Sequence, residues 1–456
     1  MEHTLKTNSP DHSKYKFLSK SPILRYFNFT VLYFAQGVPE GMLLFGIPAW
    51  MAMNDKSPGE IAGFTVACGL PWSLKFLLAP MMDRYTYLPM GRKRPWVIGG
   101  QLGLVLSLIY LALVDDPLNN LNQFMIAGFL VSLFGAFQDV AVDGMAIDLI
   151  PDHEQAKANG LMWGSKIVGV SVSLALGSWL LNKVDFFTSI CTLASVIAII
   201  MLVPILLRER AGEKIAPWTP GKTSEESKQL QVENWKLIFK SLFRVFRLKN
   251  SLLITIVLFL LQGSFNYLGT LLPIFTVKEL GWTNVFYSEH YAAAKLIGGI
   301  VGMLVGGILI DKFGKKMMLN IYFFLLILGS LILALSTKLW SNTTFISGFM
   351  IWQNILVTFA SIGILAIAMQ CCWKKVSASQ FTLFMTIGNL GRIVIAALIG
   401  PIKSNFNWQI TLLAFVLFVA LTWTIFQYLS IDSQLRKITE MDQQDIDSKV
   451  LAMAAN

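Results

Sequence analysis

Two carboxylates in the first half of the chain stand four residues apart inside an apolar stretch. Asp139 and Asp143 therefore lie on one face of a predicted helix. Neighbouring carboxylates in a partly dry site raise one another's affinity for protons. This pattern suits a group that binds a proton in one state and releases it in another. Glu40, which lies in a different apolar stretch beside Gly37 and Pro39, is the rival candidate for the same chemistry.

Four basic residues also fall inside apolar stretches. A charge at the centre of a bilayer costs about 2.5–3.5 kcal/mol on insertion scales, so each one is a candidate functional residue. For any single residue the alternative stays open that it forms an ion pair that only holds helices together. The set contains more charges than helix packing needs, and we expect Lys75 or Lys166 to pair with the ionised form of one aspartate. The four are Lys75, Lys166, Lys295 and Arg392.

The elements that must position these residues follow from composition. The chain has 456 residues, 55% hydrophobic and 14% charged, whereas a soluble chain carries about 25% charged residues. The apolar runs approach the roughly 20 residues that cross a hydrocarbon core, and they lack the alternation of barrel strands. We therefore expect an all-α membrane protein. Its twelve helices are predicted near residues 25–53, 58–82, 95–114, 122–149, 156–182, 186–207, 252–277, 285–310, 316–336, 342–370, 378–401 and 407–430.

Alternate loops between these helices differ in charge. One set is basic and the other is short and nearly neutral, so the positive-inside rule places the basic set and both termini in the cytoplasm. We expect a tail (1–24), a six-helix half (25–207), a linker (208–251), a second half (252–430) and a tail (431–456). Within the linker, 211–227 has the composition of a flexible segment. Residues 234–250 predict an amphipathic helix on the membrane surface, with a partner-binding helix as the alternative.

Several function classes fit this sequence poorly. The net charge of +10 comes from short loops, which favours topology signals and contacts with anionic lipid over nucleic acid. The four cysteines have neither disulfide nor zinc spacing. None of the four histidines begins a His-x-x-x-Asp pair or lies mid-helix, which disfavours a membrane-embedded acyltransferase. A transporter-like sensor would need a longer signalling domain. We expect no enzyme activity, cofactor or metal, and a monomer whose partners are a solute, protons and lipid.

An internal repeat divides the chain into similar halves. Residues 307–316 read Gly-Ile-Leu-Ile-Asp-Lys-Phe-Gly-Lys-Lys, and residues 79–84 read Ala-Pro-Met-Met-Asp-Arg, followed at 91–94 by Gly-Arg-Lys-Arg. The later copy closely resembles the cytoplasmic loop motif of major facilitator transporters, whose halves are duplicated. In that superfamily the motif controls conformation rather than binding substrate. The resemblance thus assigns gating roles to Asp83, Arg84, Arg92, Asp148, Asp311 and Lys312.

The same resemblance predicts where a solute binds. Helices 1, 4, 7 and 10 line the central cavity in the major facilitator fold. The corresponding helices here carry amide, hydroxyl and acidic side chains that would be costly in lipid. These are Gln36, Glu40, Gln138, Asp139, Asp143, Gln262, Ser264, Asn266, Gln353, Asn354 and Ser361. With Lys75, Lys166, Lys295 and Arg392 they are the expected solute-binding set, apart from the two aspartates and the two serines. The break expected beside Glu40 would present backbone groups to the ligand.

A narrower resemblance covers about residues 30–180. The run from Gly69 to Trp96 and the run Gln-Asp-Val-Ala-Val-Asp-Gly at 138–144 are similar to the peptide/acetyl-CoA/drug transporter branch, which includes the AmpG-type muropeptide permeases. The resemblance implies proton-coupled uptake of anhydromuramyl muropeptides across the bacterial cytoplasmic membrane. Glu40, Gly144 and Lys166 depart from the permease pattern. An acyl-CoA-like or other organic anion therefore remains the alternative solute.

Overall fold

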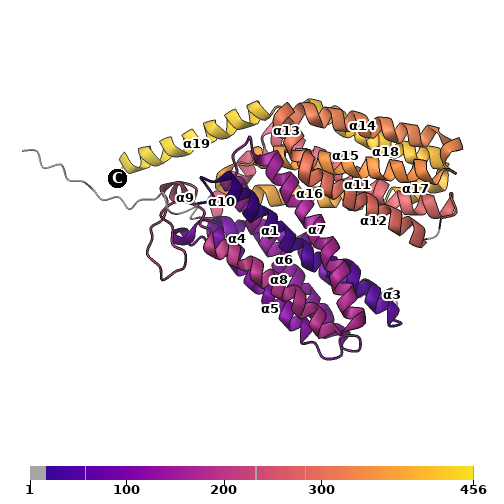
Figure 1. Cartoon of the computed structure of the whole chain (residues 1–456). Coiled ribbons are helices and arrows are strands. Elements are labelled where there is room, and N and C mark those ends of the chain that lie inside the picture. The colour runs from indigo at the N-terminus through magenta and orange to yellow at the C-terminus, as the bar shows by residue number, and fades with distance from the viewer. Residues whose placement is uncertain (1–16, 57, 232–233, 283, 455–456) are drawn as a thin grey trace, which may run out of the picture.

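The computed structural model describes residues 17–56, 58–231, 234–282 and 284–454. Regular structure in these residues is helical, and an isolated β-bridge joins Phe17 to Arg208. Figure 1 shows two helical bundles, one coloured indigo to magenta and the other orange to yellow, that touch at one end and diverge toward the other. We call the bundles the N-half and the C-half. This arrangement agrees with the predicted all-α architecture in two halves.

The N-half runs from α1 to α8. It comprises α1 (Pro22–Gly41), a π-helical turn (Met42–Gly46), α2 (Ile47–Met53), α3 (Pro58–Leu74), a 3-10 turn (Lys75–Leu77), α4 (Ala79–Arg84), a second 3-10 turn (Leu88–Met90), α5 (Arg94–Ala112), α6 (Leu121–Leu149), α7 (Gln155–Lys183) and α8 (Phe186–Leu206). The π-helical turn follows Glu40 by two residues, close to the break that the sequence predicts there.

The C-half runs from α11 to α18. It comprises α11 (Lys249–Lys278), α12 (Asn284–Val301), a π-helical turn (Gly302–Gly306), α13 (Gly307–Phe313), α14 (Lys315–Leu335), a 3-10 turn (Thr337–Leu339), α15 (Thr343–Gln370), a 3-10 turn (Lys374–Val376), α16 (Ser377–Ala396), α17 (Ile399–Asn405) and α18 (Trp408–Gln427).

Eleven helical stretches in the described residues are long and apolar enough to cross a membrane. The predicted helix 58–82 is not among them, because it is divided. The 17 residues of α3 end at Leu74, and the 3-10 turn that starts at Lys75 separates them from α4. The division falls on a residue that the sequence singles out as a buried charge. A local break of this kind exposes backbone groups and re-aims a side chain.

The two halves pack their helices in the same way. In the N-half α1 packs on α7 and α5 on α6; in the C-half α11 packs on α16 and α14 on α15. Glycines allow the closest of these contacts. A Cβ at Gly37 would lie 2.2 Å from the Lys166 carbonyl oxygen, and one at Gly391 would lie 2.0 Å from the Phe259 carbonyl oxygen. Repeated packing matches the repeated sequence motif.

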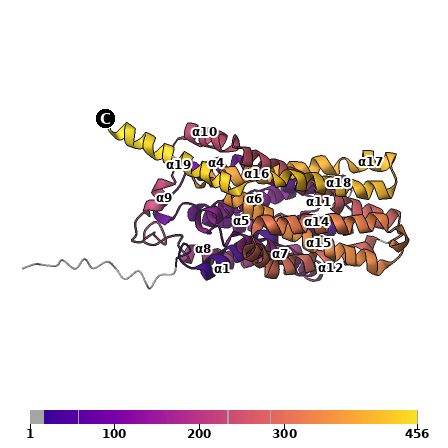
Figure 2. The same ribbon diagram turned by 90° about the horizontal axis from the view of Figure 1, so that it is seen from above.

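The halves contact each other through few elements. α7 packs on α12, α13 and α15, while α16 packs on α4, α6 and the 3-10 turn at Lys75–Leu77. In both views these contacts lie toward the end that carries α9 (Glu225–Gln229), α10 (Trp235–Phe246) and α19 (Ile431–Ala454) (Figures 1 and 2). We call this the gated end. The positive-inside rule predicts that it is cytoplasmic.

The segments outside the bundles are folded against the gated end. The Arg94 guanidinium donates to the main-chain oxygens of Lys214 and Ile215, both at 2.8 Å. The segment 211–227, which has a linker composition, is therefore fastened to the N-half. In the predicted amphipathic helix α10, Ile238 and Val245 are buried. They pack in one cluster with residues of the α15–α16 loop and of α19, namely Trp373, Val376, Ile438 and Met441. The predicted C-terminal tail thus contains a helix.

Candidate functional site

A buried ion pair joins α6 to the broken helix of the N-half. Lys75 Nζ lies 2.7 Å from Asp139 Oδ2, and the two side chains are 3% and 8% exposed. One helical turn further along α6, Asp143 accepts a hydrogen bond from the Tyr33 hydroxyl of α1. Removing one member of a buried pair leaves the other charge without compensation. A change in the charge of one of these groups therefore affects the others, and we treat them as one group: Asp139, Asp143, Lys75 and Tyr33. The sequence did not indicate Tyr33 as a member.

A second ion pair lies nearby and is more accessible to water. Lys166 Nζ of α7 is 2.8 Å from Glu40 Oε2 of α1, with side-chain exposures of 12% and 28%. The Trp72 ring of α3 lies close to both lysines, with its centroid 4.9 Å from Lys166 Nζ and 5.8 Å from Lys75 Nζ. Aromatic faces attract cations at these distances. Lys75 therefore contacts an aspartate, as one of our expectations had it, while Lys166 contacts the rival acid Glu40.

The expected solute-binding residues of the C-half are basic and neutral. The Arg392 guanidinium of α16 donates to Gln262 Oε1 of α11 at 2.7 and 3.1 Å, and Asn266 Nδ2 donates to the Arg392 carbonyl oxygen at 3.0 Å. Lys295 of α12 is exposed and lies 5.8 Å from the Tyr291 ring. Glu40 of the N-half interacts electrostatically with both Lys295 and Arg392. The charged residues of the two halves thus face a common region.

The remaining amides of the expected solute-binding set differ in their partners. Gln138 Nε2 donates to the Leu32 carbonyl oxygen at 3.2 Å, and Asn354 Nδ2 donates to the carbonyl oxygen one turn earlier in α15 at 2.9 Å. Gln36 is buried, and neither of its amide atoms has a hydrogen-bond partner among the described residues; the same holds for the Gln353 Oε1 atom. A buried polar atom without a partner is costly, so Gln36 and Gln353 each carry hydrogen-bonding groups that no described residue satisfies.

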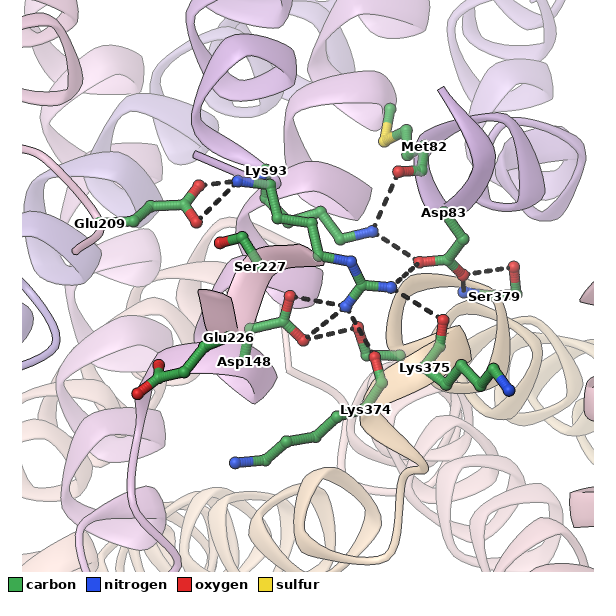
Figure 3. Close-up of polar contacts among 12 residues, drawn as sticks. Met82, Asp83, Lys93, Asp148, Glu209, Glu226, Ser227, Lys374, Lys375 and Ser379 are labelled. Atoms are coloured by element: carbon green, nitrogen blue, oxygen red, sulfur yellow. Dashed lines mark hydrogen bonds and ion pairs between the residues drawn. The ribbon is translucent and has the colours of Figure 1, made fainter. Parts of the chain in front are cut away.

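The gated end contains a network around Asp83, which is fully buried at the end of α4 (Figure 3). Its Oδ1 lies 2.6 Å from Lys93 Nζ and 3.6 Å from the Arg92 guanidinium. Its Oδ2 accepts from the Ser379 main-chain N–H at 2.9 Å and from the Ser379 hydroxyl at 2.7 Å. Ser379 lies in the first turn of α16, so the carboxylate of one half bonds the N-terminus of a helix in the other half.

Arg92 extends this network in two directions. Toward the N-half it pairs with Asp148 at the end of α6, at 2.9 Å. Toward the C-half it donates to the Lys374 and Lys375 carbonyl oxygens at 2.7 and 2.8 Å. The loop that holds it is fixed by Glu209, whose carboxylate accepts from the N–H groups of residues 92, 93 and 94 at 2.9, 2.8 and 2.5 Å. Sequence reasoning missed Glu209, because its partners are main-chain groups far away in the chain.

The second motif copy makes the corresponding contact. Asp311 of α13 accepts from the Lys157 main-chain N–H at 2.8 Å, in the first turn of α7. Lys315 donates to the Asp152 carbonyl oxygen at 2.9 Å and to Gln370 Oε1 at 2.8 Å. Gly307 lets the helices approach, because a Cβ there would lie 2.4 Å from the Ala156 carbonyl oxygen. Each motif aspartate thus bonds the opposite half.

Two of the six expected gating residues lie outside these networks. The Arg84 guanidinium lies over the rings of Tyr85 and Trp235, at 5.1 and 5.8 Å. Lys312 Nζ lies 5.3 Å from the Phe313 ring. The basic residues that enter the networks come later in the motif, at Arg92, Lys93 and Lys315. The motif spacing indicated a basic cluster, and the loop between its parts decided which member reaches the aspartate.

Comparison with known proteins shows which family this chain belongs to. The family model described as Major Facilitator Superfamily matches residues 29–396. The chain is 24% identical to the anhydromuropeptide permease of Escherichia coli (strain K12) over 385 residues, 83% of this chain and 74% of the permease. It is 25% identical over 398 residues to a protein of Rickettsia prowazekii (strain Madrid E) named as transporter AmpG 3, covering 86% and 92% of the two chains.

Solved structures agree on the fold. The major facilitator transporter FucP in its outward conformation superposes with a TM-score of 0.69 at 13% identity, over 90% of this chain and 99% of FucP. A bacterial homologue of the iron transporter ferroportin in its outward-facing state gives 0.64 at 11% identity, over 90% and 99%. These relatives and structural neighbours are transporters rather than enzymes. The chain is a multi-pass membrane transporter that belongs to the Major Facilitator Superfamily, and its curated relatives include AmpG-type permeases.

Proposed function

We propose that this transporter is a proton-coupled symporter that imports a bulky polar solute, most closely muropeptide-like, across the bacterial cytoplasmic membrane. The observation that carries the proposal is the buried Lys75–Asp139 pair with Asp143 one helical turn away. Two carboxylates and one lysine within a buried site can exist with or without an added proton, and each state needs a different arrangement of the lysine. The solute class rests on the similarity to the anhydromuropeptide permease.

The position of Lys75 links proton binding to the gate. Lys75 begins the 3-10 turn that precedes α4, and this turn packs on α16 of the C-half. α4 ends at the Asp83 contact with Ser379. A movement that separates α4 from α16 therefore displaces the turn and changes the Lys75–Asp139 distance. A longer distance weakens the attraction that holds the carboxylate ionised, so proton binding and gate opening favour each other.

Uptake into proteoliposomes tests the proposal. Labelled anhydromuropeptide should accumulate with an inward proton gradient and only equilibrate without one. Asp139→Asn and Asp143→Asn should abolish accumulation but leave solute exchange, because a fixed neutral residue cannot cycle a proton. Asp115→Asn, an exposed loop aspartate of the same half, is the matched control. If both variants accumulate solute normally and Glu40→Gln does not, Glu40 is the carrier and α6 is not.

A second candidate solute is an acyl-CoA-like or other organic anion. Lys295 and Arg392 favour it, because no carboxylate among the described residues lies within ion-pair distance of either side chain. The same liposomes distinguish the two solutes. Gradient-driven uptake of a labelled acyl-CoA, with no uptake of anhydromuropeptide, would replace the leading solute and leave the coupling scheme intact. We expect the transporter to act as a monomer with its gated end in the cytoplasm.

A further inference from the structure

We propose that Lys295 and Arg392 form an anion subsite that binds a carboxylate of the solute, and that proton loading in the N-half strengthens this binding electrostatically. The inference rests on the proposed symport function and deepens it, because it assigns solute charge to one half and proton charge to the other. It predicts that the transporter prefers anionic over neutral forms of the same solute.

The first observation is the difference in pairing between the halves. Among the described residues, the membrane-embedded lysines of the N-half have carboxylate partners at 2.7 and 2.8 Å. Lys295 and Arg392 have none in that part of the chain, and both residues are exposed at the surface of the protein. Glu40 interacts electrostatically with both of them. Its Oε2 already lies 2.8 Å from Lys166, so it does not neutralise the C-half cations directly.

The second observation is that Arg392 is oriented in advance. Two of its groups, Nε and Nη2, donate to Gln262 Oε1, and its main chain is fixed by Asn266. A guanidinium has five N–H donors, so donors remain for a carboxylate. The helices beneath it are also held closely, because a Cβ at Gly263 would lie 2.7 Å from the Gly391 carbonyl oxygen. A fixed guanidinium binds a carboxylate with less loss of side-chain entropy than a mobile one.

The third observation is the sum of charges around the common region. The cations are Lys75, Lys166, Lys295 and Arg392, and the acids are Glu40, Asp139 and Asp143. With every group ionised, four positive and three negative charges leave one positive charge. Binding of one proton to a carboxylate leaves two. A solute with one or two negative charges therefore meets a complementary site. Proton binding and anion binding favour each other by linkage.

A cysteine reporter tests the subsite without reference to the solute. Asn266→Cys places an exposed thiol beside Arg392, in a background with Cys191→Ser and with the same background lacking the new cysteine as a blank. The anionic reagent 2-sulfonatoethyl methanethiosulfonate should react faster than its trimethylammonium analogue. Lys295→Gln and Arg392→Gln should each lower the anion-to-cation rate ratio by about fivefold or more. Lys338→Gln, an exposed lysine of the C-half outside the site, should leave it unchanged. An unchanged ratio in both site variants overturns the proposal.

A binding assay tests the consequence for transport. The full-length protein in detergent should bind acidic anhydromuropeptide about tenfold more tightly than its carboxamide analogue. Lys295→Gln and Arg392→Gln should remove this preference, while Lys295→Arg retains it. The preference should be retained or strengthened when Asp143→Asn holds the proton site in its neutral charge state. If the protein binds neither form, the muropeptide proposal is wrong. The reporter then still decides whether the anion subsite exists.

Discussion

The two copies of the loop motif hold the gated end with unequal strength. Asp83 is fully buried, carries two basic partners and accepts two hydrogen bonds from Ser379. Asp311 is partly exposed, and its Oδ2 accepts from the Lys157 main-chain N–H, while its Oδ1 is buried without a hydrogen-bond partner among the described residues. One sequence motif has therefore produced a charge network around Asp83, but around Asp311 only separate contacts to main-chain groups, from Asp311 to the Lys157 N–H and from Lys315 to the Asp152 carbonyl oxygen.

The difference arises from the residues that follow each aspartate. In the first copy six residues separate Arg84 from Gly91, and this longer loop lets Lys93 fold back to Asp83. In the second copy Lys315 and Lys316 begin α14 directly, and they donate to other acceptors. Duplicated halves with unequal gates imply that one contact dominates the free energy of closure. The following variants test that conclusion.

The largest effect is expected from Asp83→Asn. It leaves Lys93 buried without its carboxylate partner, while Arg92 keeps Asp148. Breaking a buried ion pair in this way costs about 3–5 kcal/mol. The fraction of molecules with a closed gate should decrease, and turnover should fall. Solute affinity should stay within a few-fold of the wild type, because Asp83 is expected to control conformation rather than to bind solute. Double electron–electron resonance would measure the opening as a change in the distance between spin labels at Tyr87 and Phe313, which are both exposed.

Lys374→Gln is the control for this experiment, because Lys374 contributes its carbonyl oxygen and not its side chain to Arg92. An Asp83→Asn variant whose label distances match those of the wild type would show that the network does not hold the gate. Loss of solute binding in detergent would instead place Asp83 in the solute site.

Gly307→Ala should have a smaller effect. The added Cβ would lie 2.4 Å from both the Ala156 carbonyl oxygen and the Lys157 Cα, and overpacking of this kind costs about 1–3 kcal/mol. The equivalent position of the first copy is already occupied by Ala79, which is buried, so Ala79→Gly should leave the gate closed. Cross-linking of cysteines on α7 and α13 measures the approach of these helices. Equal cross-linking in wild type and Gly307→Ala would contradict the close-contact argument.

Asp311→Asn should weaken the gate by about 1–2 kcal/mol, because it removes one charge-assisted bond to the Lys157 N–H. Turnover should fall less than in Asp83→Asn, with solute affinity again within a few-fold. Initial uptake rates of the two variants, measured side by side, check the order. A larger defect in Asp311→Asn would reverse the comparison between the halves.

The last prediction concerns stability rather than the gate, and it follows from pH at the segment that fixes Arg92. Burial, together with the charge of Glu209, raises the pKa of Glu213 from 4.5 to about 8. The folded protein therefore keeps a proton between these values that the unfolded chain has released. Its stability should fall as pH rises from 4.5 through 8 and then level off. Glu213→Gln should flatten this dependence in thermal unfolding from pH 5.5 to 8.5. If the dependence of stability on pH is the same in Glu213→Gln as in the wild type, Glu213 is not its cause.

Much of this architecture was accessible from the sequence because it depends on local composition. Apolar length gave the helices, and the spacing of Asp139 and Asp143 gave a shared face. Composition did not reveal that a 3-10 turn beginning at Lys75 interrupts its helix, because the whole stretch 58–82 is apolar enough to read as one helix. Composition also did not reveal that the segment 211–227 is held against the N-half, where two of its main-chain oxygens accept from Arg94. Contacts to main-chain groups leave little trace in residue types, and that is why Glu209 was missed.

The gate also has a feature that bears on how it can change over evolutionary time. Arg92 and Asp311 each reach across to main-chain groups, the carbonyl oxygens of residues 374 and 375 and the N–H of residue 157. Almost any amino acid supplies such groups. The charged side of each contact is therefore constrained, while the partner position can drift. Searches for covarying residue pairs should overlook these links, and the partners of Arg92 and Asp311 would be visible only in three dimensions.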